Sequence, residues 1–300
     1  MIGIQDAQNK AALEQAAVEG RSLWDDARAR LFRNKAAVFA MIVLGLFTAI
    51  SLLVPLFWPH NYATIYTDRV SLPPTFEHLH ILGTDTLGRD QFARMMLGFR
   101  VSLAVGLLAT FVSLVIGVTW GAIAGFFGGR VDQVMMRLVD ALYAIPFIFF
   151  VILLTTVFER NLYLIFIAIG AVEWLTMSRI VRGQTLTTKT KEFIEAARAA
   201  GVSQPAIILR HIVPNIVGPV VIYITLIIPQ VILLESFLSF IGLGINEPLT
   251  SLGVLLSQGK AQMSSKPWLL IYPAVIMAVT LLCLNFLGDG VRDAVDPKER

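Results

Sequence analysis

Long stretches without a charged residue are the feature of this sequence that most restricts its fold. The longest covers residues 101–129 and holds 29 residues without Asp, Glu, Lys or Arg. A helix of that length, rising about 1.5 Å per residue, exceeds the roughly 30 Å hydrocarbon core of a bilayer. Only 15% of the residues are charged, whereas soluble domains carry about 25%. The sequence therefore predicts an integral membrane protein.

Six apolar segments have about the length of a transmembrane helix. Each is predicted to be a helix, because an open strand would leave its backbone groups unpaired in lipid. The expected spans are 36–59, 101–129, 141–158 with a start near Val134, 161–178, 211–234 and 267–288. The predicted fold class is thus an all-α membrane protein with six transmembrane helices.

These spans divide the chain into parts. Apolar side chains at helical spacing between Leu23 and Phe32, among several arginines, predict a short interfacial helix before the first span. The expected parts are an N-terminal tail at 1–35, a first span at 36–58, a loop at 59–100, a core with five spans at 101–288, a polar loop within that core at 185–215 and a C-terminal tail at 289–300.

The positions of Lys and Arg predict how the chain is oriented, because basic residues concentrate in cytoplasmic segments. If the N-terminus is inside, the inner segments hold 17 of the 24 basic residues and the outer segments hold 7. The inner segments in this count are 1–35, 126–137, 179–210 and 289–300. The distribution therefore predicts both termini on the cytoplasmic side, N-in and C-in.

The sequence carries none of the motifs that would indicate an enzyme or a nucleotide-binding protein. It has no G-x-x-x-x-G-K-[S/T] phosphate loop, and its single cysteine, Cys283, forms no cysteine metal site. The net charge of +3 is too small to indicate nucleic acid binding. The histidines lack a metal-ligand spacing, and His78 and His80 are interpreted as solvated loop residues. We expect no catalytic residue, bound cofactor or metal.

The most specific pattern lies between the fourth and fifth expected spans. Residues 189–203 read KTKEFIEAARAAGVS, which favours a short helix that ends at Gly201 and a second helix that begins with Ser203 and Pro205. Four side chains of the first helix are expected on one face: Phe193, Ala196, Ala197 and Ala200. These residues alone would also suit a plain surface helix that joins two spans.

The longer pattern is E-A-A, three residues, G, nine residues and H-I-V-P-N, and it resembles the EAA loop of ABC importer permeases. In that family the loop is a coupling helix that sits in a cleft of a separate ATP-binding subunit. The resemblance implies that ATP is used by partner subunits and not bound by this chain. The residues it implies for docking are Phe193, Glu195, Ala196, Ala197, Ala200 and Gly201.

The resemblance extends over nearly the whole chain. The segment 82–90, LGTDTLGRD, is similar to the L-G-T-D-x-x-G-R-D signature of the dipeptide/oligopeptide/nickel permease family, and 288–297, GDGVRDAVDP, also fits. The chain looks most like the C-type permease subunit of oligopeptide importers. This implies a type I ABC importer permease fold and translocation of oligopeptides by alternating access, with dipeptides or nickel as alternative substrates.

The resemblance also implies partners and a location. The implied partners are a second homologous permease subunit, two ATP-binding subunits, a periplasmic or lipid-anchored substrate-binding protein, the peptide and membrane lipid. The implied location is the cytoplasmic (inner) membrane of a bacterium. An ion-coupled secondary transporter is a less favoured class, because it would need coupling carboxylates near the midplane. A structural membrane protein would leave the E-A-A spacing unexplained.

Ionisable residues inside expected spans are functional candidates, because a charge in lipid is costly. Glu173 interrupts the fourth span and Glu235 ends the fifth, so both are candidates for the translocation path or a gate. A stripe of small residues at 106, 117, 121 and 125 is interpreted as a surface for close helix packing.

Overall fold

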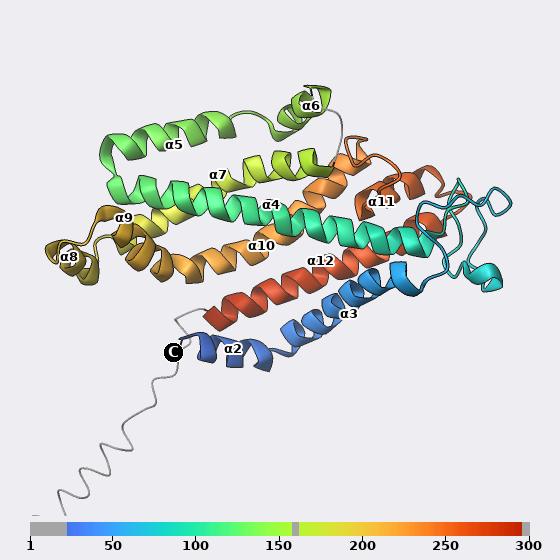
Figure 1. Cartoon of the computed structure of the whole chain (residues 1–300), viewed down its shortest axis with the longest axis horizontal. Helices are drawn as coiled ribbons and strands as arrows, with labels where there is room; N and C mark the ends of the chain where they lie inside the picture. Colours follow the sequence, from blue (N-terminus) through green and yellow to red (C-terminus); the bar gives the residue numbers. More distant parts are fainter. Residues whose placement is uncertain (1–22, 158–161, 296–300) are drawn as a thin grey trace, which may run out of the picture.

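The computed structural model describes residues 23–157 and 162–295, and helices make up the regular structure of these residues (Figure 1). The expected turn at 158–161 and most of the N-terminal tail lie outside the described residues. In chain order the helices are α2 (Leu23–Arg33), α3 (Lys35–Phe57), the short η1 (Glu77–Leu79), α4 (Gln91–Phe127), α5 (Gly129–Tyr143), α6 (Phe147–Val157), α7 (Leu162–Thr188), α8 (Glu192–Ala199), α9 (Gln204–Ile207), η2 (Ile208–Ile212), α10 (Val213–Phe240), α11 (Leu252–Ala261) and α12 (Trp268–Val295).

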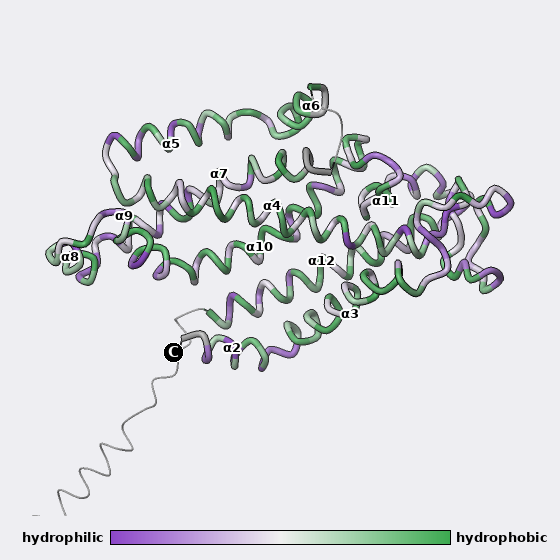
Figure 2. Tube along the Cα trace, viewed as in Figure 1, coloured by the Kyte–Doolittle hydropathy of each residue, from purple (hydrophilic) through white to green (hydrophobic). Residues whose placement is uncertain are grey.

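Four of the described helices are long and apolar enough to cross a membrane, or five if α5 and α6 together count as one broken span. The four are α3, α4, the continuous helix formed by α9, η2 and α10, and α12. Figure 2 shows apolar residues along the middle of the bundle and polar residues gathered toward its two ends. α7 is not among these spans, and it carries Glu173, Arg179 and Arg182.

The third expected span is not one helix, which corrects the interpretation of 141–158. α5 ends at Tyr143, α6 begins at Phe147, and the two are bent by 79°. Pro146 explains the break, because proline lacks an N–H and disfavours helical backbone in the residue before it. α5 is amphipathic, with polar side chains such as Asp132 and Asp140 among apolar ones.

Other boundaries also differ from the expected ones. α4 begins at Gln91, ten residues before the expected span, because Asp90 caps it by accepting a 2.8 Å hydrogen bond from the Ala93 N–H. The expected loop at 59–100 therefore ends at this cap. α10 extends to Phe240 and α12 to Val295, both beyond their expected ends. α2 coincides with the expected short helix before the first span.

α4 lies at the centre of the bundle, where glycines bring it close to α7. A Cβ atom added to Gly117, Gly121 or Gly125 would lie 2.4–2.8 Å from atoms of α7, closer than real Cβ contacts allow. Gly106 instead faces Ile232 of α10, 3.0 Å from the position of such a Cβ. The interpretation of this stripe as a packing surface is confirmed.

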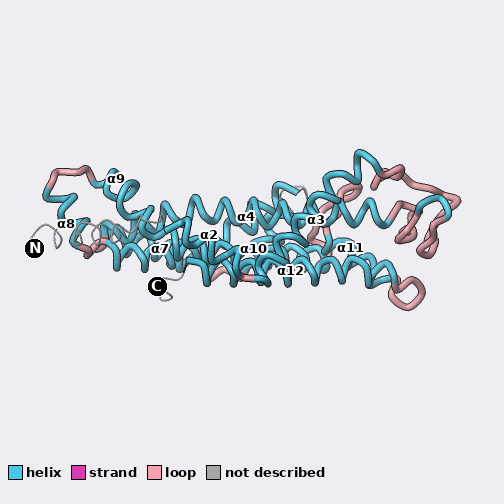
Figure 3. The backbone as a smooth tube through the Cα atoms, turned by 90° about the horizontal axis from the view of Figure 1, so that it is seen from below, coloured by secondary structure: helices cyan, strands magenta, loops and turns pink. Residues whose placement is uncertain are grey.

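Two groups of buried apolar side chains hold the helices together. The main core joins α4, α7 and α10 with α8 and η2, and the second joins α3, α4, α11 and α12. Seen from below, the bundle is elongated, with α8 and α9 at one end and the loop after α3 at the other (Figure 3). We call these the elbow end and the loop end.

Candidate functional site

The elbow, residues 192–212, turns where the sequence predicts it. Gly201 has a φ of +77°, in the left-handed region that favours glycine. The N–H of Gly201 donates to the Arg198 carbonyl at 3.0 Å, and the N–H of Val202 donates to the Ala197 carbonyl at 3.1 Å. This pair of bonds is a Schellman motif, which ends α8 and directs the chain into α9. Ser203 and Pro205 then begin α9, as expected.

The two sides of α8 differ in exposure. Phe193 is 40% exposed, and Glu195, Ala196, Ala200 and Gly201 are exposed as well. Ala197 is only 9% exposed, so it lies on the buried side of α8, unlike the other residues expected on its face. Five of the six predicted docking residues therefore lie together on the accessible side of the elbow.

Side chains of the elbow fix it to the main core. Ile194 of α8 is fully buried and Ile207 of α9 is 1% exposed, and both belong to the same buried group as Phe126 of α4. The Arg198 guanidinium lies over the Phe126 ring, 5.2 Å from its centroid. A displacement of the elbow would therefore press on the end of α4.

The elbow enters α10 through one wider turn. Residues Ile208–Ile212 are π-helical, and the N–H of Val213 donates to the carbonyl of Ile208, five residues earlier. Asn215 adds a 2.6 Å bond from its side-chain Nδ2 to the His211 carbonyl. Such π-helical turns are rare and occur often at functional sites. This turn makes up part of the expected H-I-V-P-N segment.

Ionic contacts also join helices near the elbow end. Arg182 of α7 donates two hydrogen bonds, of 2.5 and 2.6 Å, to the Asp132 carboxylate of α5. The Lys189 ammonium donates a 2.7 Å bond to the Gly125 carbonyl, at the end of α4. The bidentate pair holds the amphipathic helix α5 against α7. Sequence reasoning did not identify these residues, since their partners lie 50 and 64 residues away.

At the loop end, the LGTDTLGRD segment forms a hydrogen-bonded hub. The Asp85 carboxylate accepts bonds from the backbone N–H groups of Leu87 and Arg89 and from the Arg89 side chain at 2.7 Å. Arg89 also donates a 2.9 Å bond to Glu247, which lies in the segment before α11. The motif therefore ties the loop after α3 to the segment that precedes α11.

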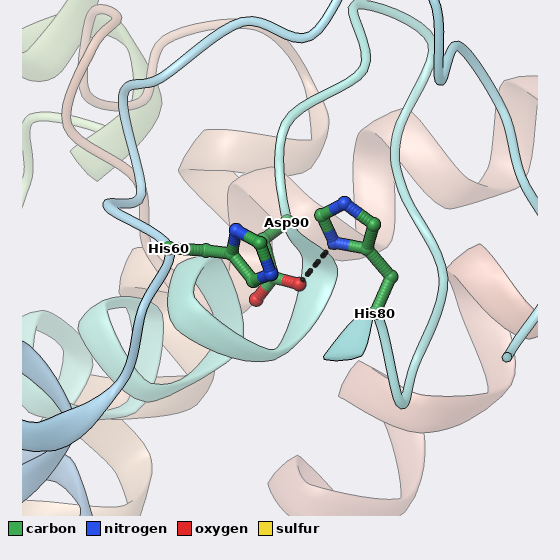
Figure 4. A group of neighbouring side chains, drawn as sticks. All are labelled: His60, His80 and Asp90. Carbon is green, nitrogen blue, oxygen red and sulfur yellow. Dashed lines mark hydrogen bonds and ion pairs between the residues drawn. The ribbon is translucent and has the colours of Figure 1, made fainter. Parts of the chain in front are cut away.

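The same motif anchors a pair of histidines (Figure 4). The Asp90 carboxylate lies 2.8 Å from His80 Nδ1 and accepts a 3.1 Å bond from the Trp58 indole. The rings of His60 and His80 are stacked, with centroids 4.1 Å apart. His80 is fully buried, so its interpretation as a solvated loop residue is wrong, whereas His78 is exposed.

The donor atoms of His60, His80 and Asp90 lie within 4.8 Å of one another, close enough to raise the question of a metal ion. Their geometry fits poorly. The two imidazole planes lie only 24° from parallel, so their in-plane lone pairs do not converge on one point. His60 also already bonds Tyr66 and the His78 carbonyl, at 3.0 and 2.7 Å. We interpret the group as a hydrogen-bonded anchor of the loop.

Glu235 is fully buried among serines where α4, α10 and α11 meet. Its carboxylate accepts a 2.8 Å bond from Ser239 and a 3.1 Å bond from Ser102 of α4. The Ser102 hydroxyl in turn accepts a bond from the Leu252 N–H, in the first turn of α11. In this conformation Glu235 joins three helices, and its side chain has no exposed surface.

Glu173 differs, because it is only half-buried on α7. Among the residues that the structure describes, no hydrogen bond or ion pair to its carboxylate is found. Tyr223 of α10 lies near Glu173 on the facing side of α7. The two candidate carboxylates thus have different surroundings, and Glu173 is the more accessible.

Comparison with family models covers most of the chain. The model described as "Binding-protein-dependent transport system inner membrane component" matches residues 117–300. The model described as "N-terminal TM domain of oligopeptide transport permease C" matches residues 22–74.

Individual relatives and structures agree with these matches. The chain is 52% identical to the oligopeptide transport system permease protein OppC of Haemophilus influenzae, over 96% of this chain and 93% of the relative. It is 53% identical to OppC of Escherichia coli K12, over 96% and 95%, and 39% identical to the dipeptide transport system permease protein DppC of Bacillus subtilis, over 93% and 87%. A chain of the inward-facing MetNI methionine ABC transporter aligns with a TM-score of 0.58 at 18% identity, over 68% of this chain and 97% of that one, which shows an ABC importer permease fold. The chain therefore belongs to the family of inner membrane components of binding-protein-dependent transport systems.

Proposed function

We propose that this chain is a non-catalytic permease subunit of an ABC importer and carries oligopeptides across the cytoplasmic membrane of a bacterium. The observation that carries the proposal is the elbow, a rigid turn seated on the core with its E-A-A side open. Relatives at 52–53% identity over nearly their whole length have the name oligopeptide permease, which supports the peptide as substrate. No bond-breaking step is assigned to this chain, and partner subunits hydrolyse ATP.

In this proposal the chain crosses the membrane six times. Four of the six spans are the continuous helices described above. The broken pair α5 and α6 is one further span, and α7 is the other. The loop end faces outward and the elbow end faces the cytoplasm, because 17 of the 24 basic residues then lie inside. A second homologous permease subunit supplies the other half of the path.

The open side of the elbow docks on one of two ATP-binding subunits. Ala196 and Ala200 allow close approach, Phe193 supplies apolar area, and Glu195 accepts hydrogen bonds at the rim of the partner's groove. Ile194 and Ala197, on the opposite side, transmit the movement to the core. ATP binding and release would then shift the two permease halves between outward-open and inward-open arrangements.

The hub at the loop end and the segment 236–266 are the proposed contacts of a periplasmic or lipid-anchored binding protein that delivers the peptide. The hub gives these segments a fixed relative position through the bond between Arg89 and Glu247. Glu173 is the proposed path residue, because it combines an intramembrane position with partial exposure. Glu235 would reach the path only if α11 moved away.

Uptake by the complete importer in proteoliposomes tests the proposal. We expect uptake of labelled oligopeptides that requires external binding protein and internal ATP. Glu195→Lys should abolish uptake and weaken co-purification of the ATPase subunits, whereas Glu77→Lys, an exposed control at the loop end, should leave ATPase binding unchanged. Peptide uptake without any ATPase subunit would refute the proposal. If the importer took up only dipeptides or only Ni²⁺, that compound and not an oligopeptide would be the substrate.

A further inference from the structure

A cavity lies between the end of α3 and the first turns of α4, at the loop end. Its volume is about 220 Å³. Apolar side chains such as Val54 and Leu97 line one part, and polar groups line the other. The polar part includes His60, Asn61 and Arg100. A site divided in this way suits a ligand with one polar and one apolar end.

Arg100 is the cation of this cavity, and its charge is uncompensated within the described chain. The residue is half-buried, three turns into a membrane-spanning helix. Among residues 23–157 and 162–295, no hydrogen bond or ion pair to its guanidinium is found. The carboxylates of the hub are engaged elsewhere: Asp85 with Arg89 and Arg94, Glu247 with Arg89, and Asp90 with His80.

A half-buried cation without an ion-pair partner among the described residues would be stabilised by an anion from outside the chain. The surroundings indicate where that anion comes from. Leu56 and Phe57 of α3 are 75% and 80% exposed, as expected for side chains that face lipid. Trp58 follows them at the helix end, a position typical of the membrane interface.

We propose that this cavity binds the phosphate group of a membrane phospholipid, with Arg100 as its ion-pair partner and the apolar wall against the start of the acyl chains. Hydrogen bonds within the chain already hold two side chains of the cavity wall in position. The Trp58 indole is fixed by Asp90 at 3.1 Å, and His60 by Tyr66 and the His78 carbonyl. Binding therefore orders few side chains, and it fastens α3 to α4 at the membrane surface.

Native mass spectrometry tests this proposal on the full chain, purified in mild detergent with the subunits that accompany it. Phosphatidylglycerol is titrated into the wild type and into Arg100→Gln, Arg100→Lys and Ala93→Leu. Arg100→Gln should bind the tightest lipid about tenfold more weakly, since it loses one charge-assisted contact. Arg100→Lys should keep most of the affinity. Ala93→Leu retains Arg100 but fills part of the cavity, so it should also weaken binding.

Arg130→Gln is the matched control, because it removes one positive charge from an exposed position at the elbow end. Its lipid binding should equal that of the wild type. Inorganic phosphate serves as the second probe, and millimolar phosphate should not displace the lipid. Equal lipid binding by the wild type and Arg100→Gln, equal loss in Arg130→Gln, or complete displacement by inorganic phosphate would each overturn the proposal.

Discussion

Arg89 and Glu247 are 158 residues apart in the sequence, yet the Arg89 Nη2 atom donates a 2.9 Å hydrogen bond to Glu247 Oε1. Their side chains are 5% and 47% exposed. This hydrogen bond lowers the pKa of the Glu247 carboxyl below its ordinary value, in spite of partial burial. The ion pair is therefore a pH-dependent connection between the loop after α3 and the segment before α11.

The lowered pKa predicts how stability changes with acid. A carboxyl whose pKa is lower in the folded chain stabilises the fold at pH values above its unfolded pKa, about 4.3, and loses that contribution as pH falls through the folded value. Glu247→Gln should therefore lower the melting temperature at pH 7 and flatten its decline in acid. Because Glu247 is half-exposed, we expect an effect below about 1 kcal/mol.

Melting of the detergent-solubilised chain between pH 7 and pH 3 would measure this. Glu77→Gln is the control, since Glu77 is 81% exposed and the distance between its Oε1 atom and His78 Nε2 is 3.8 Å. Its pH profile should match the wild type. A Glu247→Gln profile with an unchanged slope would show that the ion pair contributes nothing.

Gly201→Ala should destabilise the turn of the elbow through backbone strain and without a steric clash. No atom lies within 4 Å of the added Cβ, but a φ of +77° is unfavourable for alanine. The expected cost is about 1–2 kcal/mol, confined to the turn. We expect faster hydrogen exchange at the Val202 amide, which donates to the Ala197 carbonyl in the Schellman motif. We also expect slower ATP-driven uptake.

Gly183→Ala is the matched control for this change. Gly183 also has no atom within 4 Å of the added Cβ, but it lies inside α7 with ordinary helical backbone. Alanine there should be neutral or stabilising. If both variants exchanged and transported like the wild type, the left-handed turn would not matter for coupling.

Gly121→Val should separate α4 from α7. The added Cβ would lie 2.4 Å from the Ser178 carbonyl oxygen, which belongs to the backbone and cannot rotate away. Overpacking of this kind costs about 1–3 kcal/mol, seen as a lower melting temperature. Gly45→Val, in α3 with open space around it, should melt near the wild type. Similar melting of Gly121→Val and Gly45→Val would contradict the packing role.

Glu235→Leu should destabilise the bundle, because the hydroxyls of Ser102 and Ser239 would lose their acceptor in a buried position. We expect a loss of about 2 kcal/mol. Glu235→Gln keeps the shape and one acceptor oxygen and should lose less. Glu173→Leu provides the contrast: it should barely change the melting temperature but reduce peptide uptake. If Glu173→Leu lowered the melting temperature and Glu235→Leu reduced only peptide uptake, then Glu173 would be the structural carboxylate and Glu235 the path residue.

Local patterns predicted the elbow well. Alanine, glutamate and a following glycine determine α8 and its end by interactions within a few residues, so Gly201, Ser203 and Pro205 lie where expected. The spacing did not reveal which side of α8 the rest of the chain covers. That depends on Ile194 meeting the main core, and it turns Ala197 inward.

The hub could not be predicted in the same way. His60 and His80 lie 20 residues apart in a segment without regular periodicity, and only the folded loop stacks them beside Asp90. The prediction of a single helix for the third span was wrong for a different reason. The hydrophobicity of 141–158 is genuine, but Pro146 divides it, and the polar residues of α5 belong to a helix that packs through Asp132 on α7.

The length of α4 has a mechanical consequence. Its 37 residues extend about 55 Å, well beyond the hydrocarbon thickness of a bilayer. Asp90 at its start belongs to the hub, and Gly125 near its end is bonded by Lys189, just before the elbow. We expect α4 to act as a rigid lever, so that tilting it moves both faces of the protein at once. A movement of the elbow would then reach the hub through one helix, without a series of contacts between different helices.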